Sequence, residues 1–163
     1  GIDLHIHDNH FISLLCGTPN QVFSRGLLEE GFVNHVHTNY LFDDPGLAVS
    51  AVSGGIAADG LAFAHGFELY LEKATLQYSA GTLGGAWCPD RPLTLITGGK
   101  VTQPKLKGGT EWCAAFTAEL QTVVNAVKAG EVPAQMSGEL ARDALKVCYA
   151  EARSIASGKP VKP

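Results

Sequence analysis

Short runs of β-branched and aromatic residues, separated by turn signals, fill the middle of the sequence and constrain its fold more than any other feature. Such runs, with rough alternation of apolar and polar side chains, are typical of strands. Helical patterns precede and follow them. This order predicts an α+β fold, an open, largely antiparallel β-sheet with helices packed on one face. The expected strands after residue 21 are 33–42, 47–52, 67–77, 93–97 and 101–106.

The connections between these runs carry turn chemistry. Residues 43–46 read Asp-Asp-Pro-Gly. Proline fixes φ at one turn position and glycine tolerates positive φ at another, so a turn is expected there. The pair Gly98 and Gly99 suits a tight hairpin turn. Residues 54–66, rich in glycine and alanine, are expected to form a flexible loop.

Three segments have the spacing of amphipathic helices. Residues 3–16 form the first, although residues 2–7 also alternate as a strand does. The second follows Thr110 and the third follows Ser137, and both residue types can cap a helix N-terminus. Glycines at which the helices are expected to end are Gly17, Gly130 and Gly158.

Length and composition are those of one globular domain, expected to span residues 1–163. Hydrophobic residues make up 45% and charged residues 17%, which excludes a disordered chain. The net charge is −4 and the 12 Lys and Arg form no basic cluster. Binding to nucleic acid or to an anionic membrane is therefore not expected.

Neither a membrane span nor a signal peptide is visible in the sequence. No apolar stretch approaches the roughly 20 residues that a transmembrane helix needs. The chain opens with Gly1 in place of Met, as a segment from inside a longer protein would. The four cysteines form no C-x-x-C pair and are expected to be reduced thiols, which indicates a cytoplasmic protein.

Histidines are concentrated near the start of the chain, and three interpretations remain open. Residues 3–7, DLHIH, resemble the H-x-H segment at the end of the first strand of amidohydrolase-type barrels. On a strand, His5 and His7 would point the same way and could share a metal ion. Against this, no histidine follows His65 to supply further ligands, and such a barrel needs about 250 residues.

The other two interpretations need no metal. Any of the histidines could be a hydrogen-bonded structural residue, and His35 with His37 could form a solvated face or a subunit contact. Alternatively, Asp3 and His7 are four residues apart, so on a helix they share a face, with His10 one turn further along it. A carboxylate beside an imidazole is the pairing that removes a proton from an alcohol as hydride leaves carbon.

Residues 1–10, GIDLHIHDNH, resemble the D-x-G-x-H-x-x-D element of the Gfo/Idh/MocA oxidoreductases. Asp3 and His7 match its Asp and His, whereas His5 replaces the glycine and His10 the final Asp. In that family the Asp helps to position substrate, and the His accepts and donates the proton of the substrate hydroxyl. The resemblance implies that His7 and Asp3 are catalytic, with His10 and His5 binding substrate.

Two further stretches extend the resemblance in the family's order. Residues 66–76, GFELYLEKATL, are similar to the family's "feiyGekGtl" segment. Residues 138–161 resemble the family's last helix and its S-x-x-x-G-x-x-V ending. Together the matches cover most of the chain.

The resemblance implies the C-terminal domain of a two-domain oxidoreductase. In the family this domain uses an open sheet for substrate binding and for oligomer contacts, so a homo-oligomer is expected. NAD or NADP belongs to the protein's own N-terminal Rossmann domain. No G-x-G-x-x-G occurs in the sequence, so this fragment is expected to bind no cofactor and to be inactive alone.

Three functions therefore stay open at the level of sequence. The first is the substrate-facing half of an NAD(P)-dependent dehydrogenase, with a sugar or cyclitol as the small-molecule substrate that the family implies. The second is a non-catalytic binding or assembly module with the same fold. The third is a metal-dependent hydrolase that uses the DLHIH segment.

Overall fold

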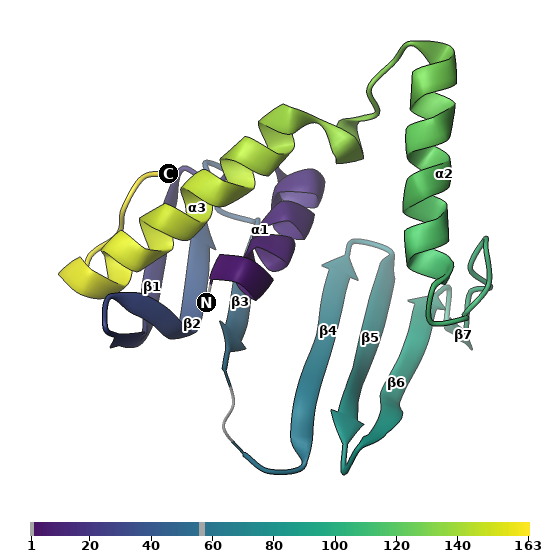
Figure 1. Cartoon of the computed structure of the whole chain (residues 1–163), viewed down its shortest axis with the longest axis horizontal. Helices are drawn as coiled ribbons and strands as arrows, with labels where there is room; N and C mark the ends of the chain where they lie inside the picture. Colours follow the sequence, from purple (N-terminus) through teal and green to yellow (C-terminus); the bar gives the residue numbers. More distant parts are fainter. Residues whose placement is uncertain (1, 56–57) are drawn as a thin grey trace. The chain divides into compact units, whose positions relative to one another are not determined.

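The computed structural model describes residues 2–55 and 58–163 (Figure 1). The chain divides into two compact units. The first unit comprises residues 2–55 and 126–163, and the second comprises residues 58–125. Among the described residues, none of the helices combines the length and apolar character needed to cross a lipid bilayer.

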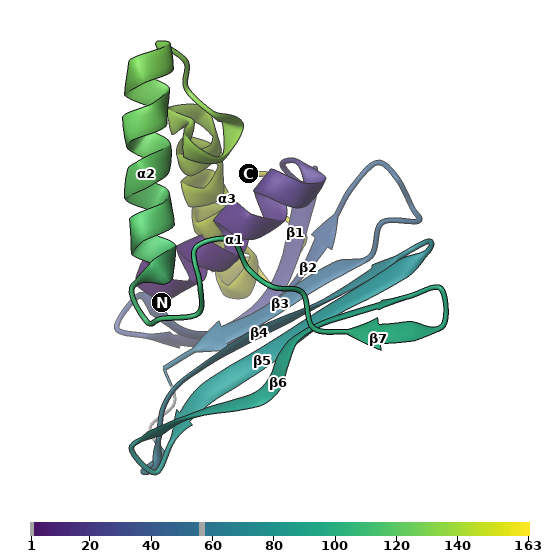
Figure 2. The same ribbon diagram turned by 90° about the vertical axis from the view of Figure 1, so that its right-hand side faces the viewer.

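The first unit is a three-stranded antiparallel sheet in the order β1-β2-β3, covered on one face by α1 and α3 (Figures 1 and 2). Val22, Thr38 and Tyr40 point to that face and are at most 3% exposed. Along β2, buried Val36, Thr38 and Tyr40 alternate with exposed His37 and Asn39. The core therefore sits between sheet and helices. Its elements are α1 Ile2–Cys16, β1 Gln21–Glu29, β2 Phe32–Leu41, β3 Val49–Gly54, a 3-10 turn Ala134–Met136 and α3 Gly138–Ser157.

Both ends of α3 follow the sequence expectation. The Ser137 hydroxyl accepts a hydrogen bond from the Leu140 amide at 3.1 Å, which caps the N-terminus. Gly158 ends the helix with φ of 69°, a conformation that glycine adopts without strain. These contacts confirm the predicted start and end of this helix.

The segment after α3 is fastened to β1. The Ser154 hydroxyl accepts from the Ser24 amide at 2.9 Å and donates to the Lys159 carbonyl at 2.6 Å. Val161 and Val22 then exchange two backbone hydrogen bonds of 2.9 Å. The S-x-x-x-G-x-x-V pattern thus has a structural role in holding the chain end against the sheet.

The second unit is a four-stranded antiparallel sheet in the order β4-β5-β6-β7. One of its faces carries a cluster of contacting aromatic rings that includes His65, Tyr78 and Trp87. The other face carries an ion pair between Glu68 and Arg91 at 2.9 Å. Helix α2 begins in this unit. The bounds are β4 Leu61–Leu71, β5 Ala74–Leu83, β6 Ala86–Thr97, β7 Lys100–Thr102 and α2 Ala114–Ala129.

The predicted α+β class with antiparallel strands is confirmed, as is the first helix with its end at Gly17. The strand interpretation of residues 2–7 is wrong, because these residues are helical. The predicted turn at Gly98 and Gly99 is confirmed, with φ values of 54° and 73° between β6 and β7.

Two expectations about the second unit are wrong. Residues 67–77 are not one strand, because the chain reverses at residues 72–73 between β4 and β5. This turn contains Glu and Lys and carries none of the glycine or proline signals. Residues 54–66 are not all loop, because β4 already begins at Leu61. Small residues suit this strand: a Cβ added at Gly66 would lie 2.6 Å from the Tyr78 carbonyl oxygen.

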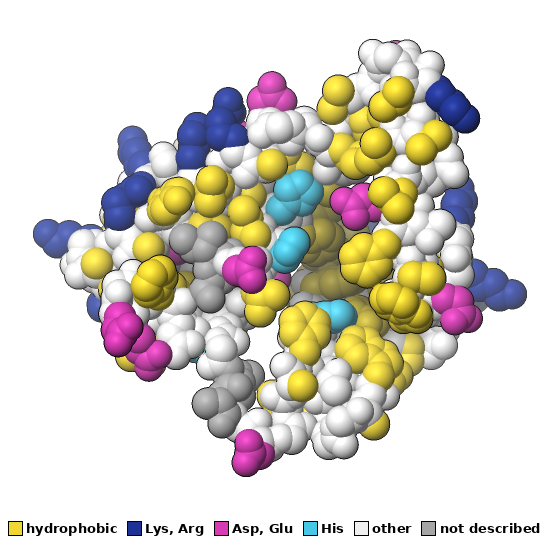
Figure 3. Space-filling view, viewed as in Figure 1, with side chains coloured by type: hydrophobic (Ala, Val, Ile, Leu, Met, Phe, Trp, Pro, Cys, Tyr) yellow, Lys and Arg dark blue, Asp and Glu magenta, His cyan; other side chains and the backbone are white. Residues whose placement is uncertain are grey.

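Helix α2 also differs from its prediction. It begins at Ala114, so Thr110 is not its cap, although Gly130 follows its end with φ of 70° as expected. None of its described residues is buried. Its apolar stripe reaches the surface, with Phe116 60%, Leu120 66% and Val127 77% exposed (Figure 3). The predicted helix therefore forms, but its predicted apolar face is not covered.

Candidate functional site

Helix α1 has two faces of different character. His5 is 3% exposed, whereas Asp3 and His7 are exposed and His10 is half-buried. At about 100° per residue, the last three lie about 140–160° around the helix axis from His5. The structure therefore brings Asp3, His7 and His10 to one side of α1 and places His5 on the other.

His5 lies between two carboxylates. Its Nδ1 is 3.1 Å from Asp8 Oδ2, and its Nε2 is 2.9 Å from Glu151 Oε1. Glu151, on α3, is only 2% exposed. Because Glu151 is shielded from water and salt, the Coulomb attraction between its carboxylate and a charged His5 is stronger than in a surface ion pair.

Asn9 and Tyr40 complete this buried network. Asn9, one turn after His5, donates from Nδ2 to Glu151 Oε2 at 2.8 Å and to Cys148 Sγ at 3.2 Å. The Tyr40 hydroxyl donates to Asn9 Oδ1 at 2.7 Å and lies 3.1 Å from Glu151 Oε1. Strand β2, α1 and α3 are thus joined by one set of polar contacts.

The contacts of His5 favour its charged form. Both ring nitrogens face carboxylate oxygens, and an ionised carboxylate only accepts hydrogen bonds, so an imidazolium with a proton on each nitrogen satisfies both contacts. Burial by itself lowers the pKa of His5, but the hydrogen bonds to Asp8 and Glu151, with the charges of both, outweigh it. The result is a pKa raised to about 9. His5 is therefore an imidazolium at neutral pH.

The Tyr40 hydroxyl and the Cys148 thiol of the network stay neutral. Burial, reinforced by the charge of Glu151, raises the pKa of the Tyr40 hydroxyl. Burial likewise raises the pKa of the Cys148 thiol to about 11, although the bond from Asn9 lowers it slightly. At neutral pH the network therefore holds a positive charge on His5, and Tyr40 and Cys148 keep their protons.

Asp3 and His7 lie outside this network. Within residues 2–55 and 58–163, no ion pair within 4.0 Å joins the Asp3 carboxylate to the His7 imidazole. Both side chains are exposed on the same side of α1, where they are open to an incoming molecule. Their roles as catalytic residues, and those of His10 and His5 in substrate binding, stay predictions.

The metal-site interpretation loses its premise. His5 and His7 stand on a helix, so two residues of separation turns them to opposite sides. Both nitrogens of His5 are also already engaged with carboxylates. The part of the chain that the structure describes contains no group of three or more His, Cys, Asp or Glu that could hold a metal ion.

Sequence reasoning missed Glu151, Asn9 and Tyr40 as members of one cluster. A signal for Glu151 was present: it follows Cys148 by three positions within the apolar stripe of the last helix, where an unpaired carboxylate would be costly. Asn9 follows His5 by four positions and so shares its face of α1. Nothing in the sequence identified Tyr40 as their partner.

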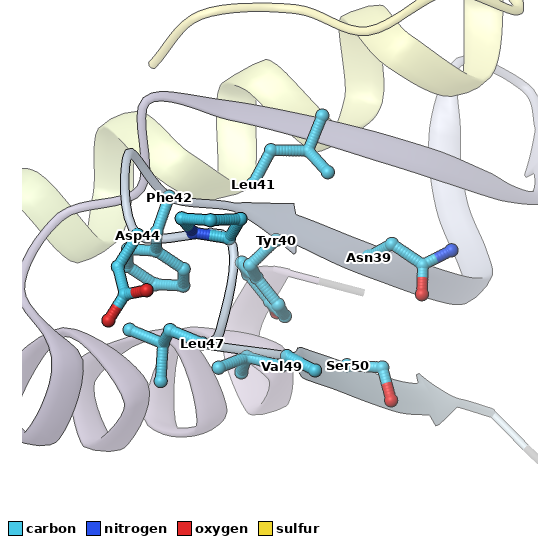
Figure 4. Close-up of a pocket in the computed structure, with 10 residues that line it drawn as sticks. Asn39, Tyr40, Leu41, Phe42, Asp44, Leu47, Val49 and Ser50 are labelled. Carbon is cyan, nitrogen blue, oxygen red and sulfur yellow. The ribbon is translucent and has the colours of Figure 1, made fainter.

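Two pockets open on the first unit. One of about 360 Å³ lies beside the β2–β3 connection and is lined by Tyr40, Phe42, Leu47 and neighbouring residues (Figure 4). The other, of about 570 Å³, lies where residues 18–21 meet the chain end. Neither is lined by any of the four predicted site residues, so neither is assigned to substrate.

Solved oxidoreductases share this fold along nearly the whole chain. An aldose-aldose oxidoreductase from Caulobacter crescentus, complexed with glycerol, matches 98% of this chain with a TM-score of 0.63 and 18% identity. Scyllo-inositol dehydrogenase from Lactobacillus casei, solved with NAD(H) and scyllo-inositol, matches 98% with a TM-score of 0.55 and 16% identity. A Bacillus subtilis protein assigned to the oxidoreductases matches 99% with a TM-score of 0.65 and 14% identity.

The chain spans about half the length of these structures, covering 46%, 47% and 51% of them respectively. No protein-family model and no curated protein matches its sequence. The TM-scores of 0.55–0.65 over nearly the whole chain establish a shared fold, and with identities of 14–18% they establish the fold alone. The fold implied by the resemblance to the second half of these oxidoreductases is thereby confirmed.

Proposed function

We propose that residues 1–163 are the C-terminal, substrate-facing domain of a Gfo/Idh/MocA-type oxidoreductase that acts on a sugar or cyclitol with NAD or NADP. The observation that carries this proposal is the match of 98% of the chain to about half of an aldose oxidoreductase and of an inositol dehydrogenase. The exposed Asp3 and His7 on α1 supply the residue types that the reaction needs.

The chemistry assigned to this chain is movement of a proton. Oxidation of an alcohol releases a proton from the hydroxyl, and an imidazole accepts it well near neutral pH. His7 would accept that proton, and Asp3, one turn away on the same side of α1, would favour the resulting imidazolium. His10 lies one turn further and would hydrogen-bond a neighbouring substrate hydroxyl.

The residues present do not fit a dinucleotide cofactor. Both described sheets are antiparallel, and a Rossmann site needs parallel strands joined through a glycine-rich loop and a helix. Hydride transfer, which a nicotinamide supplies, is therefore assigned to no residue here. We place the cofactor on the protein's own N-terminal domain.

The free thiols Cys16, Cys88, Cys113 and Cys148 favour a reducing, cytoplasmic location.

A direct test uses the full-length protein, with the 163-residue chain as its control. We expect the full-length protein to reduce NAD or NADP when it is given at least one member of a panel of inositols and aldoses. We expect the shorter chain to bind neither nucleotide and to turn over nothing. A full-length protein without a dinucleotide fold, or without detectable nucleotide binding, would contradict the proposal.

A second candidate, an assembly module, is favoured by the uncovered face of the first unit's sheet. Leu27 and Val52 are 50% and 62% exposed there, beside the exposed His35 and His37. Residues of this kind on an open sheet suit a contact with a second copy. Light scattering of the full-length protein is expected to show a homo-oligomer. Val52→Lys is expected to convert it to a monomer, whereas the control Tyr149→Lys, on the exposed surface of α3, is expected to leave it assembled. A monomeric full-length protein would exclude this assembly.

A further inference from the structure

The buried face of α1 is polar. Among residues 3–16 its buried side chains are His5, Asn9 and Ser13, and the hydroxyl of Ser13 has no hydrogen-bond partner among the described residues. Leu4 and Leu15, by contrast, are 52% and 51% exposed. Apolar contact is limited, with Ile12 half-buried against the core.

This composition determines how α1 is held. Apolar packing is non-directional, so it restricts the rotation of a helix less sharply than directed contacts do. Hydrogen bonds have narrow ranges of length and angle. The bonds from His5 and Asn9, one turn apart on α1, both end on the carboxylate of Glu151. Two bonds to one buried group, from two turns of the helix, fix both its rotation and its position along its axis.

The candidate catalytic side chains lie opposite this attachment. Side-chain tips lie about 5–6 Å from a helix axis, so a rotation of about 20° moves them by about 2 Å. A misplacement of 1 Å at a reacting group can reduce a rate about 100-fold. The direction of Asp3 and His7 therefore depends on a contact made on the far side of α1.

We propose that Glu151 is a positioning residue: by binding α1 through two of its turns, it fixes the rotation of that helix and thus the direction of Asp3 and His7. The inference rests on the proposed function for its catalytic consequence only. The charged and titratable groups around the contact are Asp8 of α1, Tyr40 of β2, and Cys148 of α3 beside Glu151 itself.

Two substitutions separate the charge of Glu151 from its length. Glu151→Gln keeps the length and removes the charge, and Glu151→Asp keeps the charge and withdraws the oxygens by one methylene. Ser154→Ala is the matched control, because Ser154 is fully buried one turn later on α3 and its hydroxyl bonds Ser24 and Lys159, which lie outside α1. All three variants are compared under conditions in which circular dichroism shows them folded.

The first readout uses the 163-residue chain and needs no activity. Amide hydrogen exchange in residues 3–16 is expected to accelerate about 10-fold or more in both Glu151 variants and to stay unchanged in Ser154→Ala. In Glu151→Gln, nuclear magnetic resonance is also expected to show that the pKa of His5 falls. Unchanged exchange in α1 of both variants would overturn the inference, whatever the activity of the protein.

The second readout uses the full-length enzyme. Both Glu151 variants are expected to lose about 10- to 100-fold in kcat with KM changed little, while Ser154→Ala keeps its kcat. Equal kcat in all variants, with α1 loosened, would overturn the catalytic part of the inference. A full-length protein with no oxidoreductase activity, together with a loosened α1, would refute the proposed function and leave the structural part confirmed.

Discussion

Replacing Glu151 with alanine is expected to lower the free energy of unfolding of the first unit by about 3–5 kcal/mol at pH 7, the usual effect of removing one partner of a buried ion pair. The substitution leaves Nε2 of the His5 ring facing an empty space and removes the carboxylate oxygen that accepts a hydrogen bond from Asn9. Urea unfolding followed by helix circular dichroism, with hydrogen exchange in β1 and β2, measures the loss. Both tryptophans, Trp87 and Trp112, lie in the second unit, so their fluorescence would not report the unfolding of the first unit.

The same pair makes this effect depend on pH. The pKa of His5 is about 9 in the folded chain and about 6.5 in an unfolded one. Because folding raises it, the stabilisation is complete below pH 6.5 and is lost as the pH rises through 9. The difference in free energy of unfolding between wild type and Glu151→Ala is therefore expected to narrow as the pH rises from 6.5 to about 9.

An exposed glutamate of α3 provides the control. Glu139→Ala is expected to cost less than about 1 kcal/mol, at every pH in this range. A Glu151→Ala variant as stable as Glu139→Ala, or a stability difference independent of pH, would show that His5 and Glu151 do not form a buried ion pair.

Replacing His7 with asparagine in the full-length protein is expected to reduce kcat by about 10²- to 10⁴-fold, the usual contribution of a general base. His7 is exposed, and no hydrogen bond or ion pair joins its side chain to another described residue, so the fold should tolerate the change. Stopped assays of nicotinamide reduction with the best polyol substrate give the rate.

Two matched controls accompany this measurement. His37→Asn changes another exposed histidine, on β2, and is expected to leave kcat unaltered. The kcat of Asp3→Asn is expected to lie between those of His7→Asn and His37→Asn, since this substitution removes only the charge beside the imidazole. Turnover within a factor of a few of wild type in His7→Asn would remove His7 from the proton transfer.

The fold was largely readable from local patterns. Capping and glycine signals placed both ends of α3, because Ser137 and Gly158 act within a single turn of chain. The hairpin between β4 and β5 was missed because its turn residues, Glu72 and Lys73, are ordinary surface residues with no backbone restriction. The exposed stripe of α2 shows that periodicity predicts a helix face without predicting what covers it.

The site was readable only in part. Spacing of four residues was enough to put Asp3 and His7 on one side of α1, and the helix confirms that geometry. The role of His5 was not readable, because it depends on Glu151, 146 positions later in the sequence. A contact at such a separation leaves no local pattern, so the only role predicted for His5 was the substrate binding that the family resemblance implied.

The separation between α1 and α3 also has a consequence for synthesis. Helix α1 is synthesised before the groups that fix it, because Glu151 follows His5 by 146 positions and the backbone contact of Val161 with Val22 comes later still. The hairpins of residues 58–125 make their pairings locally and can form while the remainder is being made. Nascent α1 therefore lacks its hydrogen bonds to Glu151 until that residue has been translated.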